Sequence, residues 1–189
     1  MKAAKLPNKD YLDECLDYNE DTGVFTWRNR PRSHFKSTRG CRIWNSRFSN
    51  TQAGSVKKTN NGKSYLKIGI DGKILFAHRL AIVFITGGID VDMEVDHIDG
   101  DGLNNKKSNL RIVTRSENQK NLRKPSTNSS GAVGVCWSKK SKKWQAQIRK
   151  KGKQIHLGFF DSISSAIKAR KIAEIELFYH KNHGTERPL

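Results

Sequence analysis

The side chains best suited to chemistry lie near the middle of the chain. Asp96 and His97 are adjacent, and Asn109 and Asn118 follow within 25 residues. Hydrolysis of a phosphodiester bond needs an activated water, a cation beside the developing charge and rigid positioning. His97 could accept the water's proton because the unperturbed pKa of imidazole lies near neutrality. Asp96 carries an oxygen ligand suited to Mg²⁺, and Asn118 could supply a second one.

The same residues also allow a simpler interpretation. An isolated Asp–His pair is more often a salt bridge or part of a capped loop, so the pair alone does not establish catalysis. Neighbouring residues of a strand point to opposite sides, so Asp96 and His97 could instead flank one phosphate. The Asp99-Gly-Asp-Gly segment hints at a calcium loop, but Leu103 stands where that pattern requires Asp or Asn.

The elements that would position these residues follow from turn signals and alternation. We expect a strand over 94–98, a loop, a second strand over 109–114 and a helix over 115–122 with Ser116 as N-cap. Upstream, a hairpin over 54–76 turns at Asp71-Gly72, and a helix over 77–86 stops at Gly87-Gly88. Residues 10–27 predict a short helix, a turn and a strand. Residues 28–53 have no clear period and predict a long basic loop that could order on DNA.

The C-terminal third predicts a separate sheet and helix. Residues 124–131 are rich in Ser, Pro and Gly and predict a linker. Strands are expected over 133–138, 144–150 and 154–159, followed by a helix over 163–179 that Asp161-Ser162 caps. Alternation places Trp144, Ala146 and Ile148 on one face, which would pack on the helix. Ile155, Leu157 and Phe159 are expected to share that face. The opposite face is polar and basic. It is either a plain solvated surface or a surface that binds DNA, because its width is about what a DNA major groove accepts.

The charge of the chain favours a polyanion as partner. Lys and Arg number 36 against 18 Asp and Glu, a formal net charge of +18. Basic residues that neutralise phosphates release counterions, which gives affinity for any nucleic acid. A basic ribosomal or chromatin-type protein without chemistry would show similar charge. Residues 90–101, however, contain six acids and no Lys or Arg; a bound cation would explain this cluster, and a solvated acidic loop is the alternative.

The cysteines and the hydropathy further restrict the kinds of protein that this chain could be. Cys15, Cys41 and Cys136 lie far apart with no C-x-x-C pair, so a zinc site is not expected. An odd, sparse cysteine count fits a reducing cytosol. No signal peptide is visible behind the first residues, and no apolar run is long enough to cross a bilayer.

The central motif resembles the HNH homing endonucleases of phage and intron origin. The resemblance rests on Val95-Asp-His-Ile-Asp-Gly-Asp, then Asn104-Asn105, Ser108-Asn-Leu-Arg111 and Ser116-Glu-Asn118. The segments Asp21-Thr-Gly and Ala77-His-Arg-Leu also look like those proteins. The resemblance implies an α+β protein with a ββα-metal core. In it His97 would be the general base, Asp96 and Asn118 would bind Mg²⁺ or Mn²⁺, and Asn109 would brace the loop. Asn118 stands where the third letter of the motif is His in other members, which could shift metal preference.

Three further residues of the central region could contact nucleic acid. Arg79 and Arg111 are candidates for binding DNA, although Arg111 could instead pair with an acid. His78 could touch the scissile phosphate, but a structural role in positioning its helix is favoured.

The C-terminal segment resembles the AP2/ERF DNA-binding domain, a three-stranded antiparallel sheet packed on one helix. The matching residues include Gly134-Val, Lys143-Trp, Ile148-Arg and Leu157-Gly-Phe-Phe. The residues that would read the major groove are then Cys136, Ser138, Gln147, Arg149, Gln154 and His156. Plant members carry Arg or Trp at several of these positions, so their site preference does not transfer.

Together these features predict a nuclease with its own DNA-reading module. We expect a basic leader over 1–53, an HNH domain over 54–123, the linker and an AP2-like domain over 132–182. The expected function is metal-dependent cleavage of double-stranded DNA in the cytoplasm of a bacterial or phage-infected cell, without a membrane. The alternative is a DNA-binding regulator with an inert HNH core. Whether one chain or two act together, and whether one strand or both are cut, stays open.

Overall fold

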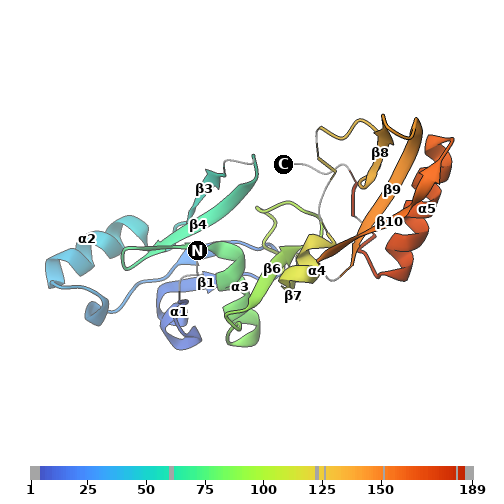
Figure 1. Cartoon of the computed structure of the whole chain (residues 1–189). Coiled ribbons are helices and arrows are strands. Elements are labelled where there is room, and N and C mark those ends of the chain that lie inside the picture. Colours follow the sequence, from blue (N-terminus) through green and yellow to red (C-terminus); the bar gives the residue numbers. More distant parts are fainter. Residues whose placement is uncertain are drawn as a thin grey trace. The chain divides into compact units, whose positions relative to one another are not determined.

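The computed structural model describes residues 5–59, 62–121, 124–125, 127–150, 152–181 and 183–185 (Figure 1). The chain divides into two compact units, one ending at Thr114 and the other beginning at Arg115. Within the described residues, no helix combines the length and the apolar character that crossing a membrane requires.

The N-terminal unit consists of short helices and three small antiparallel sheets. Its sheets pair β1 with β2, β3 with β4 and β5, and β6 with β7. The elements are α1 (Lys9–Cys15), β1 (Leu16–Tyr18), β2 (Phe25–Trp27), the 3₁₀ turn η1 (Arg32–His34), α2 (Thr38–Phe48), β3 (Ser55–Lys58), β4 (Ser64–Ile70), β5 (Lys73–Phe76), α3 (Ala77–Thr86), β6 (Met93–His97), η2 (Lys107–Asn109) and β7 (Leu110–Thr114).

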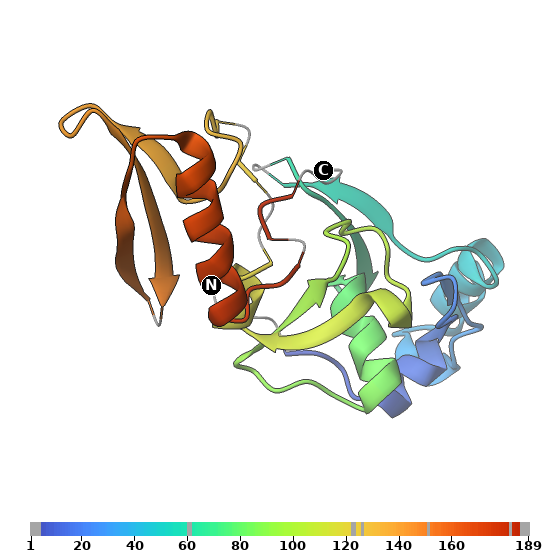
Figure 2. The same cartoon turned by 90° about the vertical axis from the view of Figure 1, so that its right-hand side faces the viewer.

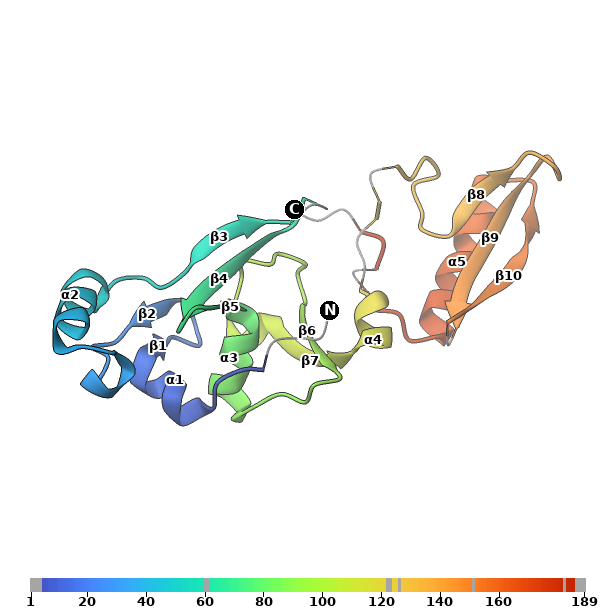
Figure 3. The ribbon, with the colours of Figure 1, turned by 60° about the vertical axis from the view of Figure 1, so that its left-hand side comes forward.

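Helix α3 is the centre of this unit. It contacts α1, β4, β5, β6 and β7, and it lies among these elements in Figure 3. Leu80, Ala81 and Val83 are fully or almost fully buried with Phe25 and Ile68 in one apolar core. The helix ends at Gly87, which adopts a left-handed conformation, as the Gly87-Gly88 signal predicts. Because α3 is buried on several sides, it can hold the β6–β7 hairpin rigidly against the rest of the unit.

The prediction of a long loop over residues 28–53 is wrong, because this segment contains α2. Ser37 caps the helix by accepting a hydrogen bond from the backbone N–H of Gly40 at 3.0 Å. Trp44 and Phe48 lie one turn apart, 5.2 Å between ring centroids, and Trp44 packs edge-on against Trp27 of β2. A small aromatic cluster therefore stabilises the helix. Because arginines surround these aromatic residues in the sequence, the segment shows no clear helical periodicity.

The expected hairpin over 54–76 is one part of a three-stranded sheet. Strands β4 and β5 and the turn between them fall where predicted. Strand β3 is an additional strand that pairs with β4; Ser55 lies opposite Lys67 at one end, and Lys58 lies opposite Ser64 at the other. Strand β3 is exposed along its whole length. The sequence of β3 is Ser-Val-Lys-Lys, in which apolar and polar residues alternate too weakly to predict a strand.

The C-terminal unit contains the sheet and helix expected there. Its elements are α4 (Arg115–Gln119), β8 (Val135–Ser138), β9 (Lys143–Lys150), β10 (Lys153–Phe160) and α5 (Ile163–Glu176). The sheet is antiparallel in the order β10-β9-β8, and α5 packs on all three strands (Figure 2). Ser162 caps α5 by accepting from the N–H of Ser165. A three-stranded sheet packed on one helix is thus confirmed, whereas the AP2/ERF resemblance stays a prediction.

The predicted alternation of β10 is wrong beyond His156. His156 pairs with Gln147 and Gly158 with Ala146, so one extra residue is accommodated in β10 as a β-bulge. Gly158 has a φ of +135°, a conformation that favours glycine. Leu157 and Phe160 therefore pack on the core, while Phe159 is exposed.

The boundary between the units differs from the expected linker. The division falls after Thr114, before α4, whereas residues 124–131 were expected to connect two domains. Lys120 explains the difference, because its Nζ donates to the carbonyl of Leu177 at 2.8 Å and its own carbonyl accepts from the N–H of His180. Helix α4 follows β7 directly, so Ser116 lies within the helix instead of capping it. Leu122 of the expected helix, Ser126 of the expected linker and the outermost termini lie outside the described residues.

Candidate active site

Asp96 and His97 are the last two residues of β6. Asp96 pairs in register with Arg111 of β7 and His97 with Leu110. Both side chains are buried, with 8% of Asp96 and 6% of His97 exposed. Successive strand residues point to opposite faces, so the carboxylate and the imidazole lie on different sides of the hairpin.

A buried amide controls the orientation of His97. The Nε2 atom of His97 lies 3.3 Å from Oδ1 of Asn105, and the amide nitrogen of Asn105 donates to the carbonyl of Leu103 at 3.1 Å. The second hydrogen bond aims Oδ1 toward the imidazole, which favours the tautomer with the proton on Nε2. In that tautomer the lone pair is on Nδ1, so Nδ1 is the basic nitrogen.

Burial lowers the pKa of His97 below its ordinary value. The contact with Asn105 and the carboxylates of Asp99, Asp96 and Asp101 act in the opposite direction but do not cancel the effect of burial. The imidazole is therefore uncharged near neutral pH. This is the protonation state that a general base requires.

A second histidine lies directly against His97. The rings of His78 on α3 and His97 meet edge to face, with 5.0 Å between their centroids. His78 is 9% exposed. Burial, together with His97 and Arg79, lowers the pKa of His78 to about 3, so it is neutral. Its packing against the rings of Phe76 and His97 is what the structural role suggested by the sequence would require. Tyr65 of β4 completes the packing, since its ring centroid lies 5.6 Å from that of His78 and 6.2 Å from that of His97.

Asn109 ties together the loop that follows His97. Its Oδ1 accepts from the backbone N–H of Asp99 at 3.1 Å, and its amide nitrogen donates to the Asp99 carboxylate and to the carbonyl of Asn104 at 3.0 and 2.8 Å. Asn104 also donates to Asp99 at 2.7 Å. These are the contacts that a bracing role for Asn109 would require.

The N-terminal hairpin supports the same loop from outside. The Tyr18 hydroxyl donates to the carbonyl of Asn105 at 2.7 Å, and the N–H of Lys107 donates to the carbonyl of Glu20. Gly23 packs so closely that a Cβ there would lie 2.6 Å from the backbone of Asn105 and Lys106. Sequence reasoning identified the turn at Thr22-Gly23 but did not connect it to the site, because the partners are far apart along the chain.

Comparison with known proteins identifies this segment. Residues 75–120 match the HNH endonuclease family model. The matched range contains Asp96, His97, Asn109 and Asn118.

Two individual proteins are also similar to the chain. Protein 3.8 of Escherichia phage T7 is 40% identical over 68 residues, which are 36% of this chain and 56% of the phage protein. The chain thus spans little more than half the length of that relative. The structure described as "DNA binding and cleavage by the HNH homing endonuclease I-HmuI" aligns with 97% of this chain and 99% of its own, at 19% identity and a TM-score of 0.39. This score is too low for the two folds to be compared in detail.

The carboxylate of the HNH motif is paired with an arginine. Nε and Nη2 of Arg111 donate to Oδ2 of Asp96 at 2.9 and 2.7 Å, which is the pairing with an acid that the sequence allowed. No group of three His, Cys, Asp or Glu suited to a metal occurs among the described residues. Mg²⁺ often binds through only one or two protein oxygens, with water and phosphate completing its shell. A buried carboxylate that already accommodates a cationic guanidinium fits that donor chemistry.

Asn118 and Arg79 lie on helices, Asn118 on α4 and Arg79 on α3. Asn118 is partly exposed on α4, within the C-terminal unit. Arg79 on α3 donates from Nη1 to the carbonyl of Met93 at 3.4 Å. It also lines a pocket of about 940 Å³ together with Leu6, Asp71 and Val83.

By register, the six predicted DNA-reading residues fall on one sheet face, with Ser138 two residues beyond Cys136 on β8. Gln147 pairs in register with His156, Arg149 with Gln154, and Cys136 lies on the same face opposite Gln145. Side chains link the strands, since Gln154 donates to Gln147 and Nε2 of Gln145 lies 3.2 Å from Nδ1 of His156. Ser138 is partly buried at the end of β8, where its Oγ accepts from the N–H of Ser141.

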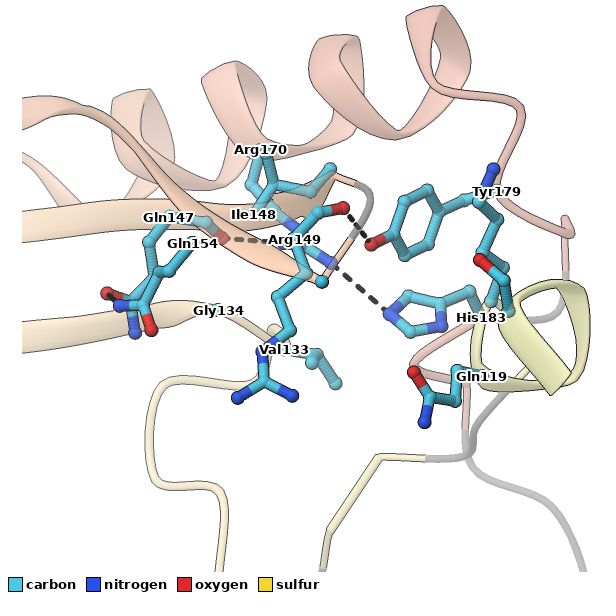
Figure 4. Close-up of a pocket in the computed structure, with 13 residues that line it drawn as sticks. Gln119, Val133, Gly134, Gln147, Ile148, Arg149, Gln154, Arg170, Tyr179 and His183 are labelled. Carbon is cyan, nitrogen blue, oxygen red and sulfur yellow. Dashed lines mark hydrogen bonds between the residues drawn. The ribbon is translucent and has the colours of Figure 1, made fainter.

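A pocket of about 450 Å³ opens beside this face (Figure 4). Gln147, Arg149 and Gln154 line one side, and Tyr179 and His183 line the other. The buried guanidinium of Arg170 donates to the carbonyl of Gln147 and approaches Nε2 of His183 at 3.2 Å. The Tyr179 hydroxyl donates to the carbonyl of Arg149 at 2.8 Å. These bonds hold the end of β9 against the segment that follows α5.

Proposed function

We propose that this chain is a metal-dependent endonuclease of the HNH homing type that hydrolyses a phosphodiester bond in double-stranded DNA. One observation carries the proposal: the segment that matches the HNH endonuclease family contains a buried, uncharged histidine directly before a loop that Asn109 ties down. The phage relative fits action in the cytoplasm of a bacterial or phage-infected cell.

The roles proposed for the residues combine their contacts with the resemblance to HNH endonucleases. His97 accepts a proton from the attacking water through Nδ1, while Asn105 holds the Nε2–H. Asn109 keeps the loop, and therefore His97, in place. Asp96 and Asn118 would hold Mg²⁺ or Mn²⁺, and the bound cation would stabilise negative charge developing on the phosphate. Arg79 and Arg111 are proposed to contact the DNA backbone.

The exposed face of β8–β10 is proposed to bind the DNA major groove in the manner of an AP2-like domain. Gln, Arg and His side chains can form hydrogen bonds with base edges, and the face carries Gln147, Arg149, Gln154 and His156. From Lys120 to the C-terminus there are sixteen Lys and Arg against four acids, which favours contact with phosphates.

Cleavage of supercoiled host or phage DNA with Mg²⁺ or Mn²⁺ tests the proposal. The wild type should convert supercoiled DNA to open-circle or linear form, and His97→Ala should not, while both shift DNA on a gel without metal. His97→Gln, which keeps a polar side chain of similar size, should also be inactive. Cleavage by His97→Ala at the wild-type rate would contradict the role of His97.

A DNA-binding regulator with an inert core is the second candidate. The observation that favours it is the ion pair between Arg111 and Asp96, which occupies one oxygen of the proposed metal ligand. Arg111→Gln separates the two candidates at saturating DNA. An endonuclease should reach half-maximal cleavage at lower Mg²⁺ in this variant, because the guanidinium no longer competes for the carboxylate. If wild type and Arg111→Gln bind DNA but neither cuts, the regulator is the better description.

A further inference from the structure

The β-bulge in β10 turns an aromatic side chain onto the polar face of the sheet. Regular alternation would place Phe159 against α5, but the register shift between His156 and Gly158 pairs Phe159 with Gln145. Phe159 is 46% exposed, while its neighbour Phe160 packs on the core. Bulges often re-aim a side chain near a functional surface. The exposure of Phe159 therefore results from a built irregularity of the strand.

Phe159 is held in a defined position on this face. Its ring centroid lies 4.6 Å from that of His156, and His156 contacts Nε2 of Gln145 at 3.2 Å. In register, Cys136, Gln145 and Phe159 form one row across the three strands. The next rows carry Gln147 with His156 and then Arg149 with Gln154. The face thus carries a large apolar ring at the Phe159 row and polar side chains around it.

Lysines lie at both ends of the sheet. Lys139, Lys140 and Lys142 are exposed in the turn between β8 and β9. At the other end, Lys150 and Lys153 lie directly opposite each other in the ladder, next to the Arg149–Gln154 pair but on the other side of the sheet. Two like charges in register repel, so an anionic partner between or above them would relieve the repulsion. This charge distribution matches a duplex whose phosphate backbones pass the two ends of the sheet.

We propose that Phe159 determines sequence specificity by contacting the 5-methyl group of a thymine in the major groove. This inference rests on the proposed binding of double-stranded DNA by the β8–β10 face. In the major groove only thymine presents a methyl group, and apolar side chains recognise it by contact. The polar residues of the neighbouring rows would bind base edges through hydrogen bonds. Among the described residues of this face, Phe159 is the large apolar side chain, and its polar and basic surroundings do not suit an apolar protein partner.

The test compares thymine-containing DNA with DNA in which uracil replaces thymine. Duplexes bound by the full-length chain are first selected from a random pool without divalent metal, and then resynthesised with deoxyuridine, which lacks the methyl group. Wild-type affinity should fall roughly fourfold for each methyl contact that is lost. Phe159→Ala should bind both duplexes equally and about as weakly as wild type binds the uracil form. Phe178→Ala, which alters a side chain that is 87% exposed outside the sheet, is the matched control and should behave as wild type.

The outcomes separate this inference from the proposed function. Equal wild-type binding of the two duplexes overturns the role of Phe159 but leaves DNA binding intact. A uracil effect of the same size in wild type and Phe159→Ala assigns the methyl contact to another residue and also overturns it. Failure of the wild type to bind any duplex overturns the proposed function itself. If Phe159→Ala does not fold, Phe159→Leu should retain a reduced preference for thymine.

Discussion

At the scale of single residues, uncharged side chains orient the candidate base, His97, and pack against it. His97 is oriented by the Asn105 amide and packed against the neutral ring of His78. Neither neighbour carries a charge that would hold a proton on His97. Because burial lowers the pKa of both histidines, the site keeps two uncharged imidazoles beside an acidic loop.

Replacing Asn105 should slow cleavage without weakening DNA binding. Asn105→Ala removes the acceptor at Nε2, so the imidazole loses its preferred orientation and tautomer. Partners of this kind typically contribute 10- to 100-fold, and we expect a rate loss of roughly that size. Asn105→Asp keeps an acceptor and should recover part of the rate. Single-turnover cleavage at saturating DNA measures the effect, and an unchanged rate in Asn105→Ala would contradict the orienting role. Thermal melting followed by circular dichroism controls for unfolding, since Asn105 is only 1% exposed.

His78 should make the N-terminal unit less stable in acid. Its pKa is about 3 in the folded protein, whereas an unfolded histidine titrates near 6.5. Between these values the unfolded chain binds a proton that the folded chain does not, so the free energy of unfolding falls as pH decreases below about 6.5. The slope approaches about 1.4 kcal/mol per pH unit within this range, and the contribution is constant above it.

The substitution His78→Phe should reduce this dependence, because phenylalanine keeps the aromatic packing but cannot titrate. Urea unfolding at about pH 7.5 and about pH 5 measures the difference in both proteins. Fluorescence of Trp27 and Trp44 reports on the N-terminal unit. An equal loss of stability in the variant would show that His78 does not cause the acid sensitivity.

At the scale of elements, the loop after His97 is enclosed by two hairpins that precede it in the chain. The β1–β2 hairpin contacts it at Asn105 and Lys107, and the start of β4 contacts it at Gly102. The region expected to be a leader is therefore part of the structure that holds the site. The loop needs glycine at position 102, because a Cβ there would overlap the carbonyl of Ser64 and lie 2.7 Å from the ring of Tyr65.

Gly102→Ala should therefore destabilise the site. Overpacking of this kind costs roughly 1–3 kcal/mol, and the displaced loop should lower the cleavage rate as well. Gly69→Ala in β4 is the matched control, since a Cβ there has no atom within 4 Å. Its effect should stay within about 0.5 kcal/mol, as for other surface substitutions. Chemical denaturation and plasmid cleavage measure both variants, and equal behaviour of the two would contradict close packing at Gly102.

At the scale of the whole molecule, charge and division into units are the main features. A net charge of +18 includes a strongly basic C-terminal unit, while the acidic segment 90–101 lies in the N-terminal unit. In the proposed complex, attraction to DNA would thus be spread over many cationic side chains, and the acidic cluster around Asp96 and His97 would repel phosphates. Such binding is expected to depend steeply on salt.

DNA affinity should fall linearly with salt on a logarithmic plot. Six to ten phosphate contacts would lower the affinity roughly 10³- to 10⁵-fold between 50 and 200 mM salt. Lys150→Gln and Lys153→Gln should each reduce the slope by about one. Lys9→Gln removes the same charge from the Lys9–Asp13 ion pair on α1 and should leave the slope unchanged. Fluorescence anisotropy across a salt series makes the comparison, and a slope that Lys150→Gln leaves unaltered would place the phosphates elsewhere.

The sequence by itself determined the features that depend on adjacent residues. The turn at Asp71-Gly72, the bounds of α3, the order of β6, β7 and α4, and the sheet with its covering helix all follow from alternation, helical periodicity and turn signals. The motif around Asp96 and His97 is equally local. Such patterns are readable because each residue's conformation depends mainly on its neighbours in the chain.

Tertiary structure decided what depends on contacts between distant residues. Helix α2 is stabilised by Trp27, the bulge in β10 appears only in its pairing with β9, and Asp96 meets Arg111 across a hairpin. The loop at Asn105 is held by Tyr18, which is 87 residues away in sequence. No pattern within a short window encodes these pairs, because each becomes favourable only when the chain brings the two surfaces together.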